Sequence, residues 1–525
     1  MELLFADKPQ GLTTHSSRNE DERRDPLVDV NDGLLELLAL RSGEKLWPIH
    51  RLDRETFGAI AFARDRETAA RARELFEATL VRKEYSFLTD RSIDRGEFAI
   101  ESFIEREGSK FVSRSEGKTN SETRFEFIRK SGRFALWCAR PSTGKPHQIR
   151  LHAEAAGIPI LGDTLHGGSA FPSLSLMSRT LEIEGRRHEV RLPVWFERLE
   201  LLGDSRLCRW LAAIDRRERW WASLSLAGLD ADATTARRVI HSEGDPLRIE
   251  ILGDVAWLSW FKESEPSEAE WTSIRALIEI RGWKTWTLQV RGDRGREPNR
   301  ALVFSSETPP PETWTATENG LAYEFRRESG LSPGLFLDQR RNREWLSKRA
   351  AGKSVLNLFS YTAGFSVAAA AGKAAKTVSV DVSKVFLEWG KRNFALNSLS
   401  TEGHEFRAMD GREYLAWAAK KGITFDFVVC DPPSFSRSKS GLFRLDKDFD
   451  ELLASCLAVV SSGGTLLFSC NYEGWSEEEF HARVKFAVTS APRSNVRFSR
   501  TPSPDPDFEL PREAHNMKSI LIARE

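Results

Sequence analysis

Apolar and polar positions along the first two hundred residues predict several strands and few helices. Short apolar runs without alternation occupy residues 3–5 and 59–63, which is typical of buried strands. Further strand-like stretches lie at 98–103, 123–128, 133–139 and 180–192. Apolar residues recur at helical spacing over 66–80 and 148–156. We therefore expect residues 1–200 to form a first domain, an α+β fold built on a mixed sheet.

The middle of the chain carries a weaker pattern. Helical spacing over residues 207–226 predicts one long helix. Two apolar runs around Gly253-Asp254, at 247–252 and 255–261, predict a hairpin. With a helix at 268–280 and a strand at 286–290, these elements predict a small β-β-α-β module. We expect residues 201–325 to be a small α+β connecting domain.

Strands and helices alternate in the last third. An apolar strand at 354–358 leads through a loop into an alanine-rich helix at 366–375, and a second strand ends in Asp381. Two more strands end near Cys430 and Cys470. Alternation of this kind predicts a doubly wound parallel sheet. We expect residues 326–525 to form a C-terminal α/β domain of Rossmann-like architecture.

Composition narrows the class of protein. At 525 residues and 40% apolar content, the chain has material for roughly two to four domains. Its five cysteines are scattered and form no C-x-x-C pair, which favours a reducing compartment and disfavours a metal site. We find no signal peptide and no apolar run long enough to span a membrane. We expect a soluble, cytoplasmic, monomeric protein.

Charge is balanced over the whole chain, with 77 basic and 77 acidic residues. Between Lys110 and His152, however, ten lysines and arginines stand against three acidic residues. Such a local excess suits contacts with nucleic-acid phosphates, although a solvated surface also carries charged runs.

A charged turn at residues 50–58 lies between two apolar runs. An aspartate in a turn, such as Asp53, is usually a backbone cap. Three further blocks accompany this turn in order, at residues 7–12, 83–85 and 140–152. Together the four blocks resemble the RluA-type pseudouridine synthases. The resemblance implies that Asp53 is the catalytic aspartate, that Tyr85 packs against the target base and that Arg150 pairs with Asp53.

These residue types suit the implied isomerisation of uridine to pseudouridine, which uses no cofactor. A carboxylate can act as nucleophile or base while it stays ionised, and a neighbouring guanidinium favours that state. The uracil must leave its stack, which gives an aromatic residue a role in the pocket. One residue departs from the family pattern, because Phe57 stands where a small residue is usual. This departure concerns local packing.

Acidic residues follow successive strands in the last third of the chain. Asp381 comes about twenty residues after the first loop, Asp410 follows a further predicted strand, and Asp431 opens Asp431-Pro432-Pro433. In doubly wound sheets, ligands bind beyond the carboxyl ends of the strands, and an acidic residue ending the second strand takes ribose hydroxyls. A simple loop cap is the alternative role of each aspartate.

This series resembles the class I S-adenosylmethionine-dependent methyltransferases. Residues 334–340 and 361–365 narrow the resemblance to enzymes that make 5-methylcytosine or 7-methylguanine in large-subunit ribosomal RNA. It implies S-adenosylmethionine as cofactor, with Asp381 at the ribose, Asp410 at the adenine amine and Asp431 near the target base. The full set that we expect to bind the cofactor is Asn357, Phe359, Tyr361, Thr362, Gly364, Phe365, Asp381, Asp410 and Asp431. Ala363 stands where the family often has a second glycine.

The methyl acceptor stays open between two bases. Carbon-5 of cytosine becomes a nucleophile only after a thiolate adds to carbon-6, and Cys470, at the end of a predicted strand, is the candidate thiol. A guanine ring nitrogen needs orientation alone. Residues 471–475 look closer to the guanine-modifying relatives.

We therefore expect a fused RNA-modifying enzyme with large-subunit ribosomal RNA as its partner and no metal. Tethering both sites would raise the effective concentration of the second site on the same RNA. The alternative is a methyltransferase whose synthase-like domain is inactive and serves as an RNA-binding platform, for which Phe57 is the only hint. A small-molecule acceptor is disfavoured by the attached synthase-like domain.

Overall fold

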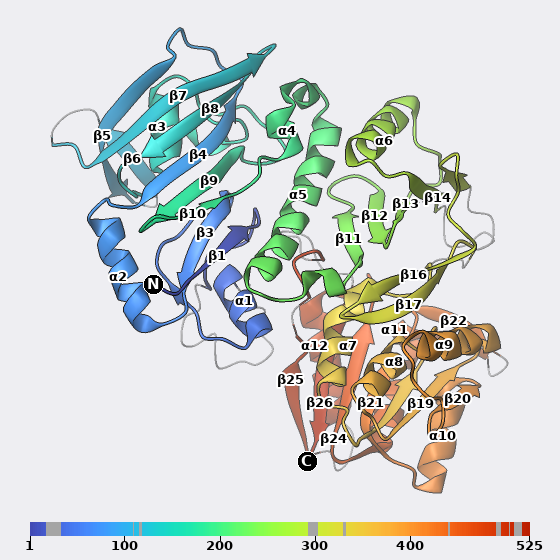
Figure 1. The fold of residues 1–525 in the computed structure, drawn as a ribbon. Helices are drawn as coiled ribbons and strands as arrows, with labels where there is room; N and C mark the ends of the chain where they lie inside the picture. Colours follow the sequence, from blue (N-terminus) through green and yellow to red (C-terminus); the bar gives the residue numbers. More distant parts are fainter. Residues whose placement is uncertain are drawn as a thin grey trace.

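The computed structural model describes residues 1–16, 33–108, 110–114, 118–291, 303–328, 332–438, 441–489, 495–502, 504–508 and 517–525. Figure 1 shows three sheets that follow one another along the chain, with the long helix α5 between the first and the second. Within the described residues, no helix is both long enough and apolar enough to cross a membrane.

The first sheet of the described chain has ten strands in the order β1-β3-β9-β4-β8-β7-β5-β6, with β2 on β3 and β10 on β9. The strands are β1 (Leu3–Lys8), β2 (Trp47–Pro48), β3 (Phe57–Ala63), β4 (Arg82–Thr89), β5 (Glu97–Glu107), β6 (Lys110–Arg114), β7 (Ser121–Ser131), β8 (Phe134–Pro141), β9 (Leu176–Ile183) and β10 (Arg186–Glu189). All pairs are antiparallel except β3 with β9. The predicted α+β mixed sheet is confirmed.

Helices pack on this sheet, and two of them, α2 and α3, lie where helical spacing predicts them. They are α1 (Leu34–Ser42), α2 (Arg66–Glu77), α3 (Gln148–Ala155), α4 (Val194–Glu197) and the 3-10 helices η1 (Thr164–His166) and η2 (Leu199–Gly203). The predicted strand at 180–192 is instead a hairpin of β9 with β10. The chain reverses at Glu184 and Gly185, which both have positive φ values of 47° and 75°.

Helix α5 (Ser205–Leu226) links the first sheet to the second. The Asp204 side chain caps it by accepting from the amide of Leu207. Twelve of its side chains are buried, because α5 packs on β1 on one side and on α6 (Glu268–Arg281) and β11 (Ala236–His241) on the other. The predicted helix at 207–226 therefore lies between two sheets.

The second sheet, as far as the structure describes it, has five strands in the order β11-β12-β13-β14-β15. The predicted module is present as β12 (Leu247–Leu252), β13 (Val255–Trp260), α6 and β14 (Thr285–Val290). The edge strands β11 and β15 (Val303–Ser305) were not predicted, because two arginines interrupt the first and the second has only three residues. A separate hairpin follows, made of β16 (Thr313–Glu318) and β17 (Leu321–Arg326).

The third sheet of the described residues has the order β20-β19-β18-β21-β24-β26-β25. Its first five strands run parallel, and β26 and β25 add an antiparallel edge. The strands are β18 (Ser354–Leu358), β19 (Lys376–Asp381), β20 (Glu405–Ala408), β21 (Phe425–Cys430), β24 (Val460–Cys470), β25 (Val496–Arg500) and β26 (Lys518–Arg524).

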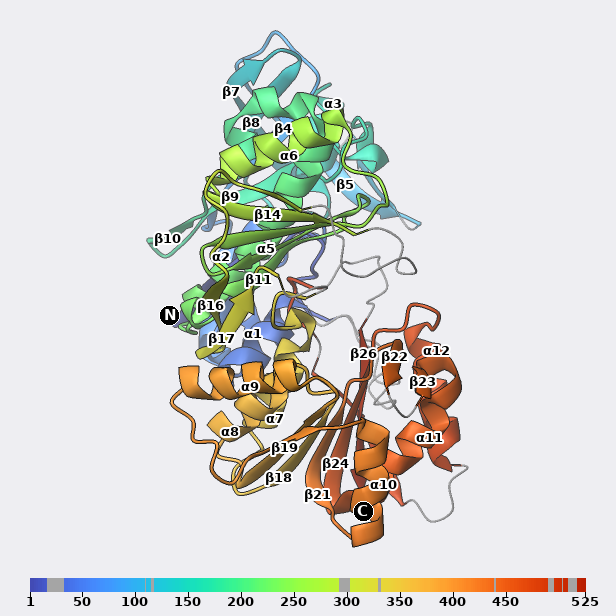
Figure 2. The same ribbon diagram turned by 90° about the vertical axis from the view of Figure 1, so that its right-hand side faces the viewer.

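Helices lie on both faces of the third sheet, as Figure 2 shows. They are α7 (Arg340–Ser347), α8 (Gly364–Ala371), α9 (Lys384–Leu396), α10 (Gly411–Lys421), α11 (Leu445–Ala458) and α12 (Glu477–Thr489). A small hairpin of β22 (Phe435–Ser438) and β23 (Gly441–Arg444) follows β21. The doubly wound α/β architecture predicted for this part is confirmed.

Candidate active sites

The structure brings Asp53 and Arg150 together across 97 positions of sequence. Asp53 lies in the turn between β2 and β3, where its carbonyl accepts from the amide of Thr56. Arg150 is the third residue of α3, and its Nη1 lies 3.9 Å from Asp53 Oδ2. His147 Nε2 lies at the same distance from this oxygen. The Asp53 carboxylate thus faces positive charge from one helix.

Arg150 has a second and closer carboxylate partner that the sequence did not suggest. Its Nε and Nη2 each donate to Asp163 over 2.7 Å in a two-pronged pair. Asp163 is buried and follows the Gly162 turn after α3. Two parallel bonds fix the plane of a guanidinium. The pair with Asp163 therefore holds Arg150 in place and leaves Nη1 facing Asp53.

Two histidines complete this cluster. His147 Nδ1 and His166 Nε2 lie 3.0 Å apart, and His147 Nε2 lies 3.3 Å from Arg150 Nη1. Burial lowers the pKa of His166 to about 4, and burial followed by the charge of Arg150 lowers the pKa of His147. Both rings are therefore neutral near pH 7. Only the block at 140–152 pointed to His147, and nothing singled out His166.

Tyr85 stands on β4 beside Asp53. Burial, and then the negative charge of Asp53, raise the pKa of Tyr85 to about 12. The phenol therefore stays protonated at neutral pH. The ring packs against two neighbouring hydrophobic clusters. Tyr85 is thus held rigidly next to the carboxylate.

Lys8 explains why the block at residues 7–12 accompanies the Asp53 turn. Its side chain is fully buried, and Nζ donates to the carbonyls of Pro9, Arg54 and Thr56 over 2.8 to 3.1 Å. Burial lowers its pKa to about 7, against the charges of Glu55 and Asp53. Lys8 therefore fixes the backbone on the far side of Asp53 from Arg150.

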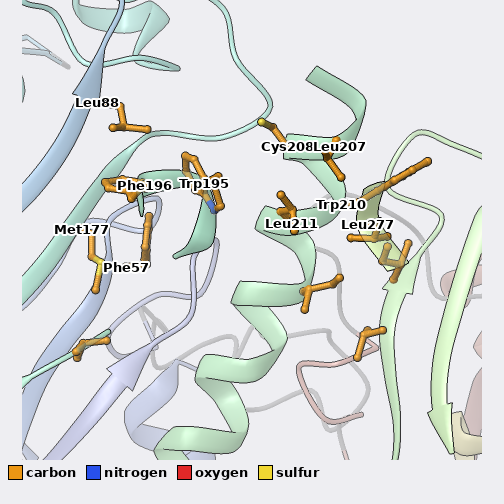
Figure 3. Packing of buried hydrophobic residues seen from close by; sticks show 14 of the residues in the cluster. Phe57, Leu88, Met177, Trp195, Phe196, Leu207, Cys208, Trp210, Leu211 and Leu277 are labelled. Atoms are coloured by element: carbon orange, nitrogen blue, oxygen red, sulfur yellow. The ribbon is translucent and has the colours of Figure 1, made fainter. Parts of the chain in front are cut away.

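Phe57 points away from this cluster. Its ring is 1% exposed and packs in the hydrophobic core with Trp195 and Phe196, as Figure 3 shows. The next residue, Gly58, has a φ of 104°, and an added Cβ there would lie 2.2 Å from the carbonyl oxygen of Ser178. The residue that departs from the family pattern therefore belongs to the hydrophobic core and not to the cluster around Asp53.

Three aspartates lie at the carboxyl edge of the third sheet. Asp381 ends β19, and its carboxylate accepts from the amides of Tyr361 and Ser383 over 2.9 Å. Asp410 caps α10 and pairs with Arg412 at 3.0 Å. Asp431 follows β21 and accepts from Gln339 Nε2 at 3.0 Å.

Asp381 and Asp431, at the ends of the strands on either side of β18, are not ordinary surface carboxylates. Burial raises the pKa of Asp381. Burial, followed by the nearby charge of Asp338, raises the pKa of Asp431 to about 7. An aspartate whose ionised form is disfavoured binds hydroxyl or amine hydrogens strongly, because these restore the solvation it has lost.

The loop between β18 and α8 has an unusual backbone. Phe359, Tyr361 and Ala363 all have positive φ, between 47° and 60°. Such values are uncommon outside glycine and cluster at binding sites. Tyr361 Oη donates to the carbonyl of Ser332, and Thr362 Oγ1 donates to that of Gly334 over 2.5 Å. The loop is therefore anchored in a strained form.

Ala363 fits because its neighbour lacks a side chain. A Cβ added at Gly390 of α9 would lie 2.8 Å from the Cβ of Ala363. Ala363 thus stands where the family has a second glycine. Its positive φ is a strained conformation for alanine, and its side chain has room because Gly390 has no Cβ.

The expected cofactor residues divide into two groups. Asn357 and Phe365 point inwards, Asn357 donating to Ser366 Oγ and Phe365 packing in a hydrophobic cluster. The others lie on the loop or at the strand ends. Beside Asp381, Val382 and Val385 expose 58% and 64% of their surface, an apolar patch that the sequence did not suggest and that suits an adenine ring. The donor set and this patch fit S-adenosylmethionine.

Cys470 ends β24 at the same edge but is fully buried. Its Sγ accepts from the amide of Tyr472 at 3.3 Å, and burial raises its pKa. Cys430 and Cys456 are buried as well. Among the residues that the structure describes, no group of three or more histidines, cysteines and acids could hold a metal ion.

Comparison with known proteins adds two family matches. The sequence model of the S-adenosylmethionine-dependent methyltransferases matches residues 236–508, and that of the RNA pseudouridylate synthases matches residues 2–155.

Two curated relatives are ribosomal RNA methyltransferases by name. The ribosomal RNA large subunit methyltransferase K of Neisseria meningitidis is 35% identical over 246 residues, which is 46% of this chain and 68% of the relative. The ribosomal RNA large subunit methyltransferase K/L of Hahella chejuensis is 41% identical over 199 residues, 38% of this chain. The match spans 26% of the K/L relative.

Solved structures show the same fold. A S-adenosylmethionine-dependent methyltransferase from Streptococcus mutans is 25% identical, with a TM-score of 0.51 over 60% of this chain and 81% of its own. The methyltransferase SMU.776, solved with S-adenosylhomocysteine, covers 71% of this chain and 98% of its own at 24% identity and a TM-score of 0.52.

Proposed function

The chain belongs to the S-adenosylmethionine-dependent methyltransferase family and carries a pseudouridine synthase domain at its N-terminal end, and we propose that both units act on ribosomal RNA of the large subunit. The observation that carries the proposal is the presence of two separate carboxylate centres, one around Asp53 and one around Asp431. The names of the relatives support the choice of RNA.

In the first unit, Asp53 would break and rebuild the glycosidic bond of uridine. Arg150 would present the positive charge of Nη1 to the Asp53 carboxylate, while Asp163 holds the guanidinium in position. Tyr85, protonated and packed, would lie against the extruded uracil. Lys8 keeps the turn that carries Asp53 from shifting. No redox group is needed, since the reaction exchanges one bond to ribose for another.

In the second unit, bound S-adenosylmethionine would supply an electrophilic methyl group. Asp381 would accept from its ribose hydroxyls, and the loop of Phe359 to Gly364 would hold its methionine part. Asp410 would accept a hydrogen bond from the adenine amine. Its carboxylate would then be shared between this amine and Arg412. Asp431 would then lie beside the acceptor base.

We propose guanine as the acceptor base and a ring nitrogen, N7, as the acceptor atom. The cytosine route requires an accessible thiolate, and the thiol of Cys470 is buried with a raised pKa. Alkylation of a guanine nitrogen requires only that the base be oriented. The buried thiol is the observation that separates the two bases.

Nucleoside mass spectrometry of ribosomal RNA, from cells with and without this chain, tests the proposal. We expect one pseudouridine and one methylguanine to depend on it. Asp53→Ala should remove only the pseudouridine, and Asp431→Ala only the methyl group. If Asp53→Ala leaves every pseudouridine in place while the methyl group still depends on the chain, the first unit is an RNA-binding platform. If neither modification depends on the chain, the proposal is wrong.

A further inference from the structure

A large cavity opens between the second sheet and the methyltransferase sheet. Its volume is about 730 Å³, within the range of roughly 300–1,000 Å³ that is usual for ligand pockets. Figure 2 shows the second sheet standing over the carboxyl edge of the third. Ser434, three residues after Asp431, and Asn471, next to Cys470, line the cavity on the methyltransferase side. The cavity therefore reaches the same edge of the third sheet as Asp431.

The wall formed by the second sheet is cationic. Arg248 on β12 and Arg291 after β14 line it, together with Lys262 and Glu263 after β13, and Lys262 pairs with Glu270 at 3.3 Å. Arg238 also lines it, but Glu250 already neutralises that side chain through bonds of 2.6 and 3.2 Å. Arg248 and Arg291 thus present positive charge to one side of the cavity.

Arg248 is the cation that is best placed to bind a ligand. Its guanidinium stacks over Phe261 at 4.7 Å, and its Nε is buried without a hydrogen-bond partner among the described residues. Burial, and then the charge of Arg238, lower its pKa to about 10, so it stays charged at pH 7. A desolvated guanidinium with free donors favours an anion such as a phosphate.

The opposite wall presents Asp338, whose carboxylate lies within electrostatic reach of Arg248 and Arg343. In the part of the chain that the structure describes, no hydrogen bond or ion pair reaches its side chain. Its neighbour Gln339 is fixed between Asp431 and Asn342, with bonds of 3.0 and 2.7 Å. Asp338 therefore sits on a rigid 3-10 helix, η4 (Leu337–Gln339), and faces the cavity one residue from the bond to Asp431.

An ionised carboxylate can only accept hydrogen bonds, so its natural ligand presents N–H or O–H groups. Guanine offers two adjacent N–H donors, N1–H and the 2-amino group, on the edge opposite N7. Cytosine offers only its 4-amino group. A base bound to Asp338 by two N–H groups would leave N7 free to meet the methyl group.

We infer that this cavity binds the acceptor nucleotide, with Asp338 accepting from the two N–H donors of guanine and with Arg248 and Arg291 facing the flanking phosphates. The inference rests on the proposed methylation of RNA and names the residues that select the base. It also gives the second sheet a function, which is to hold the backbone of the RNA strand.

The experiment uses the full-length protein and a synthetic RNA fragment that contains the mapped acceptor position. The fragment carries either guanosine or inosine there, because inosine lacks only the 2-amino group. For the wild type we expect kcat/KM to fall about tenfold on inosine, the typical loss when a buried carboxylate loses one donor. Asp338→Asn should abolish that preference, while the Kd for S-adenosylmethionine and the melting temperature stay unchanged.

Arg248→Gln tests the phosphate wall. We expect KM for the RNA to rise about fivefold to tenfold with kcat unchanged, and the slope of log K against log salt to become shallower by about 0.7 to 0.9. Arg275→Gln is the matched control, because Arg275 is an exposed arginine of the same domain, on α6, and does not line the cavity. It should match the wild type in both measurements.

Three outcomes would overturn the inference. One is an unchanged preference for guanosine in Asp338→Asn. Another is weakened binding of S-adenosylmethionine by Asp338→Asn with the base preference intact, which would assign Asp338 to the cofactor. A third is Arg248→Gln indistinguishable from Arg275→Gln. A wild type that methylates neither fragment instead refutes the proposed function, so the two failures are distinguishable.

Discussion

Replacing Arg340 by methionine should destabilise the region in which helix α5, the second sheet and the methyltransferase domain pack together. Arg340 is fully buried at the start of α7. Its Nη1 donates to Asp507 over 3.0 Å and to Asp505 over 3.2 Å, and its Nη2 donates to the carbonyl of Ala236 on β11. The guanidinium also lies 5.1 Å from the ring of Trp221 on α5. Methionine keeps the apolar stem and removes the charge and the donors.

The magnitude follows from what the substitution leaves behind. Removing one partner of a buried ion pair typically costs roughly 3–5 kcal/mol, because the other charge stays buried and uncompensated. In Arg340→Met the uncompensated group is Asp507, whose side chain is fully buried. For a unit of about 200 residues, a loss of this size lowers the melting temperature by about 6–20 °C.

The effect should depend on pH in a defined direction. Burial raises the pKa of Asp507 to about 6 even with Arg340 present. A carboxyl group whose folded pKa lies above its unfolded value stabilises the fold at low pH and loses that contribution as the pH rises through the folded pKa. Without Arg340 the pKa should rise further. We therefore expect the destabilisation by Arg340→Met to be larger at pH 8 than at pH 5.

Differential scanning calorimetry at pH 5 and pH 8 measures the loss of stability and its dependence on pH. Because the chain has several hydrophobic cores, it can unfold in more than one transition, and the transition at the lowest temperature is followed separately. Arg340→Met with Asp507→Asn should recover part of the loss at pH 8, since the double variant has no buried charge to leave unpaired. If Arg340→Met has the same melting temperature as the wild type at pH 8, the ion pairs of Arg340 do not determine stability and the reasoning is wrong.

Three further predictions follow from single residues. Lys8→Met should lower pseudouridine formation at least about tenfold with methylation unchanged, because three buried carbonyls lose their donor; exposed Lys45→Met is the control, and nucleoside analysis is the readout. Cys470→Ala should keep methylation within about threefold, whereas a covalent cytosine route would lose it entirely. Gly58→Ala should lower the melting temperature and pseudouridine formation together, because its φ of 104° and the carbonyl of Ser178 exclude a Cβ.

Most elements of the fold could be predicted because their apolar residues repeat at the spacing of a helix or a strand. Helices α2, α5 and α6 begin within two residues of the expected positions, since each carries a capped amphipathic face. The edge strands β11 and β15 of the second sheet were not predicted. In β11, Arg237 and Arg238 interrupt the apolar pattern because each pairs with a partner remote in sequence, an aromatic ring or Glu250. Patterns report local burial and contain no information on such partners.

The residues of the candidate sites could also be predicted only in part. Asp53, Arg150 and the strand-end aspartates lie in ordered motifs, so the sequence could nominate them. Asp163 and His166 contact Arg150 and His147 only after the turn behind α3 folds back, which no spacing reveals. The role inferred for Asp338 follows from its place in the wall of the cavity, which the sequence alone does not reveal.

Helix α5 forms buried ion pairs with the residues on both sides of it. Arg217 and Arg219 are two positions apart, which places them roughly 200° apart around a helix. Arg219 binds Asp7 of β1 over 2.7 Å, and Asp7 is buried with its pKa raised to about 6. Arg217 instead donates to the carbonyl of Asp507 over 2.9 Å and pairs with Glu243.

A cut before α5 would therefore leave Asp7 unpaired next to Lys8, which holds the Asp53 turn. A cut after α5 would leave Glu243 and Asp507 without Arg217. We expect both fragments, 1–200 and 227–525, to melt at least about 10 °C below the intact chain, because each exposes one buried charge and one apolar face. An inactive fragment would then report lost packing, not lost chemistry. If either fragment has the melting temperature of the intact chain, α5 is a passive linker. Otherwise each site is tested by point substitutions in the full chain, such as Asp53→Ala for the first site.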